Sequence, residues 1–377
     1  MVTLSGAFAP MNGPSMPTEG PLLAAVSVTK HFKLGPPWSR HLLHAVDEVS
    51  LEIPRASIVA LVGESGSGKS TLVRLFDMLY RPTSGEIYFE GQPLSEVHGR
   101  RAQLGYRRNV RMVFQDPFSV SNPAYRISHS LSRSAKLHRP ELRPRERRLE
   151  VERVLDAVGL SPGHELIDRF PHELSGGQRQ RVGFAEALLS RPRLILADEP
   201  VSMLDVSIRI GLLNLMADLR DNEGVSVLYV THDIASAWYL ADTVAVMYAG
   251  RLVEYGPADV VLQAPNHPYT QLLLSAVPDP RVALPSSDEA GEPPRVIDPD
   301  EGCRFRWRCP YAQERCATAT PTLTTIKGHQ VACFVAAERY ESSGVAPTEP
   351  DVASGSETSM TSFASERAQV QTRAGTT

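Results

Sequence analysis

The stretch SIVALVGESGSGKSTLVRLF, residues 57–76, decides the fold of this chain. A short apolar run at 58–62 leads into a glycine-rich loop and then into a helical repeat of apolar residues. The loop reads G-x-x-x-x-G-K-[ST], and between a strand and a helix this pattern is typical of a phosphate-binding loop. Its glycines let backbone N–H groups surround phosphate oxygens, and the helix start adds a partial positive charge. The stretch therefore predicts an α/β fold with a nucleotide site.

The same motif predicts a role for individual side chains. Lys69 is expected to reach the β- and γ-phosphates, and the Ser70 hydroxyl is expected to ligate Mg²⁺. The residues expected to contact the nucleotide in this loop are Gly63, Glu64, Ser65, Gly66, Ser67, Gly68, Lys69, Ser70 and Thr71.

A second apolar run, at 194–197, ends in Asp198, Glu199 and Pro200. A carboxylate at the carboxyl end of a strand can lie beside the phosphate loop and hold Mg²⁺, which is the role predicted for Asp198. Glu199, one residue further, is predicted to polarise an attacking water. Two adjacent acids after a strand are otherwise typical of a solvated loop, so these roles depend on the phosphate loop upstream.

The segment LSGGQ at 174–178 precedes another helical pattern, and Ser175 is suited to cap that helix. With the phosphate loop before it and the acidic strand end after it, the sequence resembles the ATP-binding subunit of an ABC transporter over about residues 23–340. The resemblance implies an α/β P-loop NTPase with a RecA-like core, an antiparallel β subdomain and a helical subdomain. A small cysteine-containing extension would follow this cassette.

The resemblance also implies a site shared between two subunits. Ser175, Gly176, Gly177 and Gln178 would contact the γ-phosphate of ATP held by the opposite subunit. Gln115 would sense Mg²⁺ and join its ligands Ser70 and Asp198. The catalytic set would be Glu199, Gln115 and His232, the last of which would contact the γ-phosphate.

Two further positions acquire roles by the same resemblance. Phe32 matches an aromatic residue that stacks on adenine, although a lone Phe before a strand is more often a core residue. Asp205 matches a loop that crosses the dimer interface. Phosphate loop, glutamine, signature, acidic strand end and histidine each occur once and in the family's order.

Finer features resemble the ATPases of bacterial dipeptide and oligopeptide importers, which include nickel importers. These features are the segments GESGSGKST, VFQDPFSVSNP, DEPVSMLDVSIR and HPYTQLLLSAVP. The implied partners are a second ATPase subunit, identical or different, two membrane permeases and, indirectly, an external binding protein. The chain would lie peripherally on the cytoplasmic face of the membrane. Nickel import and a non-transport ABC ATPase are the alternatives.

Composition limits the organisation of the chain. Its 377 residues suggest two domains, and only 11 of its 30 prolines fall within 38–256. We expect a flexible leader (1–22), a cassette (23–256, helical subdomain about 116–190), an accessory domain (257–340) and a disordered tail (341–377). The proline-rich stretch 278–299 is expected to be an extended linker.

Several partner classes are disfavoured by the sequence. We find no membrane-spanning apolar stretch and expect no secretory signal. The formal net charge is −4. The basic run at 133–148 lacks interleaved aromatics, so we expect a solvated helical face and no nucleic-acid partner.

All four cysteines, Cys303, Cys309, Cys316 and Cys333, lie in the C-terminal region with the spacing C-x₅-C-x₆-C-x₁₆-C. Such a cluster favours a metal site over two disulfides. Paired C-x₂-C knuckles of common zinc modules are absent, and nearby aromatics suit a shielded [4Fe–4S] cluster. Zn²⁺, disulfides and free thiols are the alternatives.

One residue departs from the resemblance. Glu186 follows the signature where related sequences usually carry Arg. Either a partner subunit compensates this reversed charge, or the surface has drifted.

Overall fold

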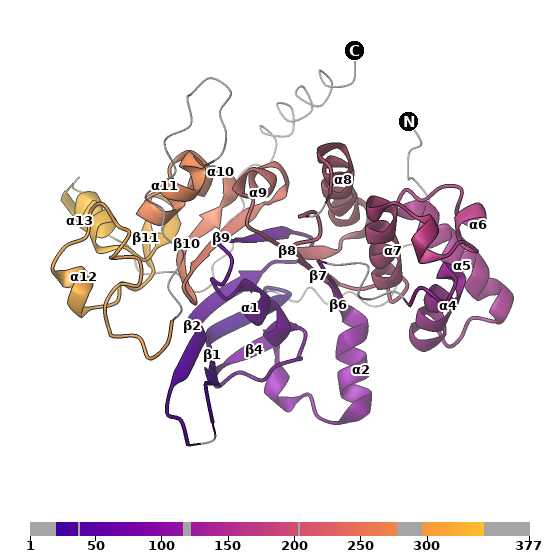
Figure 1. Cartoon of the computed structure of the whole chain (residues 1–377), viewed down its shortest axis with the longest axis horizontal. Coiled ribbons are helices and arrows are strands. Elements are labelled where there is room, and N and C mark those ends of the chain that lie inside the picture. Colours follow the sequence, from indigo (N-terminus) through magenta and orange to yellow (C-terminus); the bar gives the residue numbers. More distant parts are fainter. Residues whose placement is uncertain (1–19, 37, 116–121, 203, 277–295, 343–377) are drawn as a thin grey trace, which may run out of the picture.

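A computed structural model describes residues 20–36, 38–115, 122–202, 204–276 and 296–342 (Figure 1). The predicted leader and the linker lie largely outside these residues, and the tail lies almost wholly outside them. Residues 116–121, at the predicted start of the helical subdomain, and Met203 also lie outside.

The described strands form two sheets. The antiparallel sheet has the spatial order β2 (Leu42–Ile53), β1 (Leu23–Lys33), β4 (Ser84–Phe89) and β5 (Gln92–Pro93). The larger sheet has the order β11 (Thr324–Ile326), β12 (His329–Val331), β10 (Arg251–Pro257), β9 (Thr243–Tyr248), β3 (Ile58–Val62), β8 (Ser226–Thr231), β7 (Leu194–Asp198) and β6 (Val110–Val113).

The strands β9, β3, β8, β7 and β6 run parallel to one another and form the centre of the molecule. Every residue of β3, β7 and β8 is buried, as expected for parallel strands covered on both faces. The strands predicted from the two apolar runs are therefore confirmed. Because parallel strands present their carboxyl ends at one edge, the loops after β3, β7 and β8 meet there.

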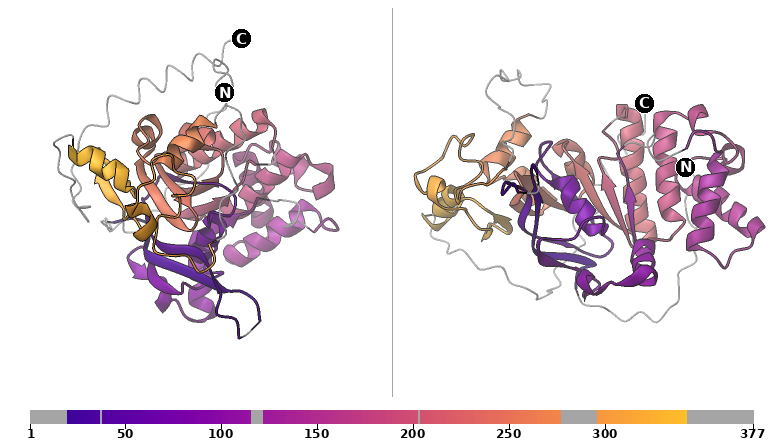
Figure 2. Two further views of the ribbon diagram at one scale, coloured as in Figure 1. Left: turned by 60° about the vertical axis from the view of Figure 1, so that its left-hand side comes forward. Right: turned by 60° about the horizontal axis from the view of Figure 1, so that its bottom comes forward.

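Helices cover the larger sheet and extend beyond one end of it (Figures 1 and 2). In chain order the described helices are α1 (Lys69–Phe76), α2 (Gly99–Asn109), α4 (Ile127–His138), α5 (Pro144–Ala157), α6 (Gly163–Leu166), α7 (Gly176–Leu188), α8 (Val206–Glu223), α9 (Ile234–Leu240), α10 (Ala258–Gln263), α11 (Pro268–Ser275), α12 (Arg315–Thr318) and α13 (Phe334–Ser342). Helices α4–α7 gather at one end, and α12 and α13 lie at the other. The expected α/β architecture, with an antiparallel part and a separate group of helices, is confirmed. None of the helices in these ranges combines the length and apolar character needed to span a bilayer.

The C-terminal region is joined to the larger sheet through β12, which pairs with β10. Glu254 of β10 is completely buried beside this pairing. Its carboxylate contacts Nε2 of His329 at 2.8 Å and accepts hydrogen bonds from the backbone N–H groups of Asn266 and His267. All three partners follow β10 in the chain. A second junction is a bridge between Leu43 of β2 and Ile297.

The basic run predicted as a solvated face lies on α4, α5 and the turn between them. Arg148 forms ion pairs with Glu152 at 2.9 Å and with Asp168 at 2.8 Å. Arg139 pairs with Glu150 at 3.1 Å. Arg139 and Arg148, two of the basic residues in this run, are therefore paired with acids of the same chain.

Candidate active site

The phosphate loop connects β3 to α1 and has the geometry that its glycines require. Gly68 has φ +105°, and a Cβ added there would lie 2.2 Å from the carbonyl oxygen of Ala45. Only glycine fits such a backbone and such a close approach. Lys69 is buried, and its Nζ donates to the carbonyl oxygens of Gly63 at 2.7 Å and Glu64 at 2.8 Å. Burial lowers the pKa of Lys69, while Glu199 and Asp198 oppose that shift.

Two oxygen groups lie side by side at the start of α1 and the end of β7. The Ser70 hydroxyl donates to Oδ1 of Asp198 at 3.2 Å, although 128 residues separate them. Burial raises the pKa of Asp198, an effect that the Ser70 hydrogen bond opposes. Hydroxyl and carboxylate oxygens are ligands that Mg²⁺ accepts, so this pair fits the predicted ion.

Glu199 lies at the centre of a second group of side chains. Its Oε2 accepts a hydrogen bond from Nε2 of Gln115 at 3.1 Å and lies 3.3 Å from Nδ1 of His232. Gln115 Nε2 also lies 3.3 Å from the Ser202 hydroxyl, a contact that sequence reasoning missed. The structure therefore brings together the three residues predicted to be catalytic, from the ends of three neighbouring strands.

The backbone of Glu199 is unusual. Its φ is +47°, in the left-handed region that a residue with a side chain rarely adopts. Its N–H donates to the carbonyl oxygen of Val230 at 3.0 Å, which holds this conformation. The residue thus turns sharply out of β7, and such strain is often found where a side chain must be aimed.

The signature residues lie elsewhere in the chain. Ser175 caps α7 as predicted: its Oγ accepts from the N–H of Gln178 at 3.2 Å, and Gln178 Oε1 accepts from the N–H of Ser175 at 3.0 Å. Gly177 is buried against Ile208 of α8. In Figure 1, α7 lies with α4–α6, away from α1. Within the described ranges, no hydrogen bond or ion pair joins residues 174–178 to residues 63–70.

The two remaining predicted contacts lie at the periphery. Phe32 is within β1 rather than before a strand, and its half-buried ring contacts Tyr80 edge-on with 5.3 Å between centroids. Asp205 is exposed and immediately precedes α8. Both side chains are accessible for the contacts predicted for them.

Glu186 of α7 has a partner that neither sequence interpretation anticipated. The side chain is half-buried, and burial raises its pKa, while the positive charge of Arg111 of β6 opposes that shift. The reversed charge on the signature helix is therefore balanced in part within the same chain.

The four cysteines are free thiols gathered in the C-terminal region. The N–H of Cys303 donates to the carbonyl oxygen of Cys316 at 2.8 Å, and every pair of the four thiols is close enough to interact electrostatically. Burial raises the pKa of Cys303 to about 11, and it raises that of Cys309 and Cys333 too. A bound cationic centre would be needed to hold them as thiolates.

The separation of the thiol sulfur atoms can be compared with that of ligands around a single metal ion. Sulfurs around one Zn²⁺ lie about 3.8 Å apart, given Zn–S bonds of about 2.3 Å. Among described residues, only His31, His44 and Asp47 bring three potential ligand atoms within 4.8 Å of one another. No three of the four cysteine sulfur atoms lie that close together.

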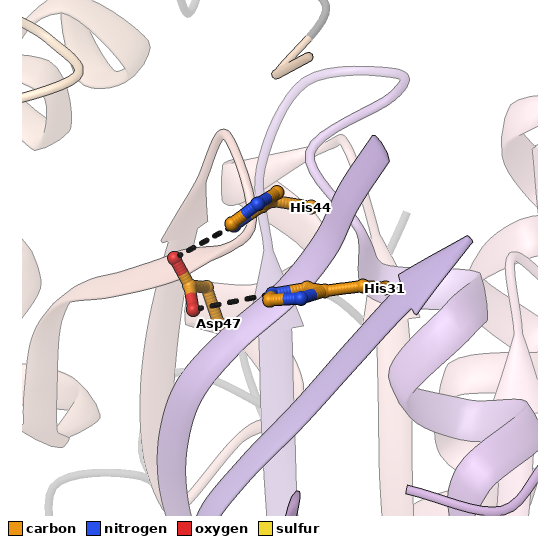
Figure 3. A group of neighbouring side chains, drawn as sticks. All are labelled: His31, His44 and Asp47. Atoms are coloured by element: carbon orange, nitrogen blue, oxygen red, sulfur yellow. Dashed lines mark ion pairs between the residues drawn. The ribbon is translucent and has the colours of Figure 1, made fainter. Parts of the chain in front are cut away.

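The group of His31, His44 and Asp47 is a junction between segments (Figure 3). The histidine nitrogens lie 3.6 and 3.5 Å from the carboxylate oxygens of Asp47. The same carboxylate contacts Arg304, from the cysteine-containing region, and Arg251 at 3.2 Å. Two guanidinium groups already balance its charge, so the arrangement does not favour a metal cation.

Comparisons with known proteins agree with this geometry. Residues 46–202 match the family described as ABC transporter, and residues 253–316 match the family described as oligopeptide/dipeptide transporter, C-terminal region. The chain is 41% identical to the di/tripeptide transport ATP-binding protein DppF of Pseudomonas aeruginosa, over 83% of this chain and 97% of that protein. The chain belongs to the ABC transporter family. This ABC ATPase is also 41% identical to the dipeptide transport ATP-binding protein DppF of Escherichia coli, over 84% of this chain and 95% of the relative.

Solved structures show the same cassette fold. The ATP-binding cassette MJ0796, in a dimeric post-hydrolysis state bound to ADP and Pi, is 28% identical, with a TM-score of 0.56. It aligns with 63% of this ABC ATPase and 98% of its own chain. CbiO1 from Clostridium perfringens, part of the ABC transporter complex CbiONQ, is 26% identical, with a TM-score of 0.56, over 68% of this chain and 99% of its own. The fold predicted from the phosphate loop is confirmed.

Proposed function

We propose that this ABC ATPase powers the import of peptides through a membrane permease. The single observation that carries this proposal is the convergence of Gln115 and His232 on the Glu199 carboxylate beside the phosphate loop. The peptide substrate is supported by relatives named for dipeptide and di/tripeptide transport.

The hydrolytic role of each side chain follows from its position. Backbone N–H groups of the loop and Lys69 would bind the phosphates, which places the γ-phosphate near Glu199. The Glu199 carboxylate would accept a proton as water forms a bond to the γ-phosphorus and the bond to the ADP oxygen breaks. Gln115 and His232 would orient that carboxylate, and His232 would also contact the γ-phosphate. Mg²⁺, held by Ser70 and Asp198 with Gln115 nearby, would supply positive charge to the phosphates.

A second subunit would complete the site. Ser175–Gln178 lie on α7, away from the phosphate loop of their own chain, so these residues would contact ATP bound by a partner. The dimeric state of MJ0796 supports this arrangement. ATP would hold the two subunits together, with Asp205 at their interface and Phe32 on the adenine. Hydrolysis at the cytoplasmic face of the membrane would let the two subunits reopen and so drive two permeases. An external binding protein would deliver the substrate to these permeases.

The C-terminal region would hold a [4Fe–4S] cluster through Cys303, Cys309, Cys316 and Cys333. The four free thiols are gathered in one region and each is close enough to interact with the other three, which supports this proposal. Such a centre would supply a structural or redox-sensitive element outside the hydrolytic site. The division into a cassette at 23–256 and an accessory domain at 257–340 separates these two roles.

Uptake by a strain lacking this gene tests the transport proposal. The strain would be complemented with the wild-type chain or with Glu199→Gln and supplied with labelled dipeptides, oligopeptides or nickel. Peptide uptake restored only by the wild-type chain is expected. If only nickel uptake is restored, the transported substrate is nickel and not a peptide. Copurification with nucleic acid or ribosomes instead of permeases would indicate a non-transport ATPase.

A further inference from the structure

Glu64, the first variable position of the phosphate loop, has every polar group engaged. Its N–H donates to the Tyr269 hydroxyl at 2.8 Å, and its carbonyl oxygen accepts from Lys69 Nζ at 2.8 Å. Its carboxylate accepts two hydrogen bonds from the Arg308 guanidinium, at 2.8 and 2.9 Å. Two of these three partners come from the region after β10. The start of the loop is thus held from outside the loop.

Arg308 approaches Glu64 from a sequence distance of 244 residues, immediately before Cys309. Its side chain is 12% exposed, and that of Glu64 is 26% exposed, so solvent screens this pair only in part. The two-pronged geometry adds directional strength to the charge attraction. The paired hydrogen bonds from Arg308 can therefore fix the orientation of the Glu64 carboxylate, which charge attraction alone would not do.

The residues that present Arg308 and Tyr269 are themselves firmly packed. Phe305 is buried and contacts Tyr248 edge-on at 5.1 Å and Tyr269 at 5.5 Å between ring centroids. Tyr248 and Tyr269 contact each other at 4.6 Å. Tyr269, whose hydroxyl accepts the hydrogen bond from Glu64, is therefore packed within a cluster of three aromatic rings.

A second contact from the same segment reaches the other end of the loop. Arg304 donates to the carbonyl oxygen of Ala249 and pairs with Asp47. Gly250, which follows Ala249, donates its N–H to the carbonyl oxygen of Ser67 at 2.8 Å. The segment 304–308 therefore contacts the phosphate loop directly at Glu64 and through one intermediate turn at Ser67.

We propose that Arg308 and Tyr269 are positioning residues for ATP binding, which act by holding Glu64 and hence the shape of the phosphate loop. The proposal rests on ATP hydrolysis at this site. In this structure Lys69 Nζ donates to the carbonyl oxygens of Gly63 and Glu64. When ATP binds, these N–H groups must donate to the phosphates instead. Arg308 and Tyr269 then keep the loop in its binding conformation, so the C-terminal region contributes to nucleotide affinity without touching the nucleotide.

The test compares Arg308→Gln and Tyr269→Phe with a matched control, Arg306→Gln, in the full chain. Arg306 is similarly shielded, at 13% exposed, but its ion-pair partner is Asp300 within its own segment. Binding of a fluorescent ATP analogue and the steady-state kcat and KM would be measured. We expect Arg308→Gln to raise Kd and KM roughly tenfold and Tyr269→Phe about threefold, with kcat nearly unchanged. Arg306→Gln should bind as the wild type does.

A double-mutant cycle separates positioning from a general loss of folding. If Arg308 acts through Glu64, the variant Glu64→Gln/Arg308→Gln should bind no more weakly than Arg308→Gln alone. Additive losses, or wild-type affinity in both Arg308→Gln and Tyr269→Phe, would overturn the proposal. If Arg308→Gln does not fold, Tyr269→Phe decides the question because it removes one oxygen only. Absence of ATP binding by the wild-type chain would reject the ATPase function itself.

Discussion

Oε2 of Glu199 lies 3.3 Å from Nδ1 of His232, across the ends of the neighbouring strands β7 and β8. Gln115 donates to the same oxygen. One carboxylate oxygen thus receives two side chains that can orient it, while the left-handed backbone of Glu199 aims the group out of the sheet.

Replacing this carboxylate by an amide should separate binding from turnover. Glu199→Gln keeps the size of the side chain but removes the proton acceptor, so we expect ATP binding to persist while kcat falls at least about a hundredfold. Phosphate release and nucleotide binding measure the two effects. Undiminished phosphate release would remove Glu199 from the mechanism.

Lys69→Ala should instead weaken nucleotide binding. The substitution removes a buried charge that faces the phosphate position, and we expect Kd for ATP to rise more than about tenfold. Lys136→Ala, on the exposed side of α4, removes the same charge far from the loop and serves as the control. An affinity equal to the wild type in Lys69→Ala would contradict the phosphate role.

Two glycines of the phosphate loop should respond differently to alanine. At Gly68 a Cβ would lie 2.2 Å from the backbone oxygen of Ala45, whereas at Gly66, with φ +79°, nothing lies within 4 Å. Gly66→Ala should cost about 1–2 kcal/mol through its backbone alone, and Gly68→Ala more than about 3 kcal/mol. Denaturant unfolding measures both, and equal losses would refute the close contact.

Asp77, which follows α1, should make stability depend on pH. Burial raises its pKa to about 6, above its ordinary value of 3.8. The folded chain therefore binds the proton more tightly, and the stability that this provides is present below about pH 4 and is lost as pH rises through 6. The change that Asp77→Asn makes in the free energy of unfolding should thus be about 2 kcal/mol more stabilising at pH 7 than at pH 4. A gain independent of pH would show that charge is not the cause.

The cysteine cluster predicts the behaviour of iron in the purified protein. Anaerobic preparations should contain iron and absorb broadly in the visible range, and Cys316→Ser should abolish both properties. Ala317→Ser places a serine at the exposed neighbouring position without removing a thiol, so it should retain iron. A colourless protein that contains zinc would disprove the cluster.

Features encoded by contiguous residues could be predicted from the sequence. The strand 58–62, the phosphate loop and the cap at Ser175 depend on local spacing, and the structure has them where they were expected. The contacts of Glu64 could not be predicted, since Arg308 and Tyr269 reach it only through the packing of Phe305. Nor does any sequence signal identify Ser202, because its contact depends on the turn that follows Glu199.

The burial of Glu254 has a consequence for shortened versions of the chain. Every partner of its carboxylate follows Pro257, and β12 covers the edge of the strand that carries it. A protein cut after Pro257 would keep the phosphate loop, Asp198 and Glu199 yet carry an unpartnered acid on an open sheet edge. Such edges pair readily with other chains, so truncation at this point should yield an aggregating fragment instead of a minimal ATPase.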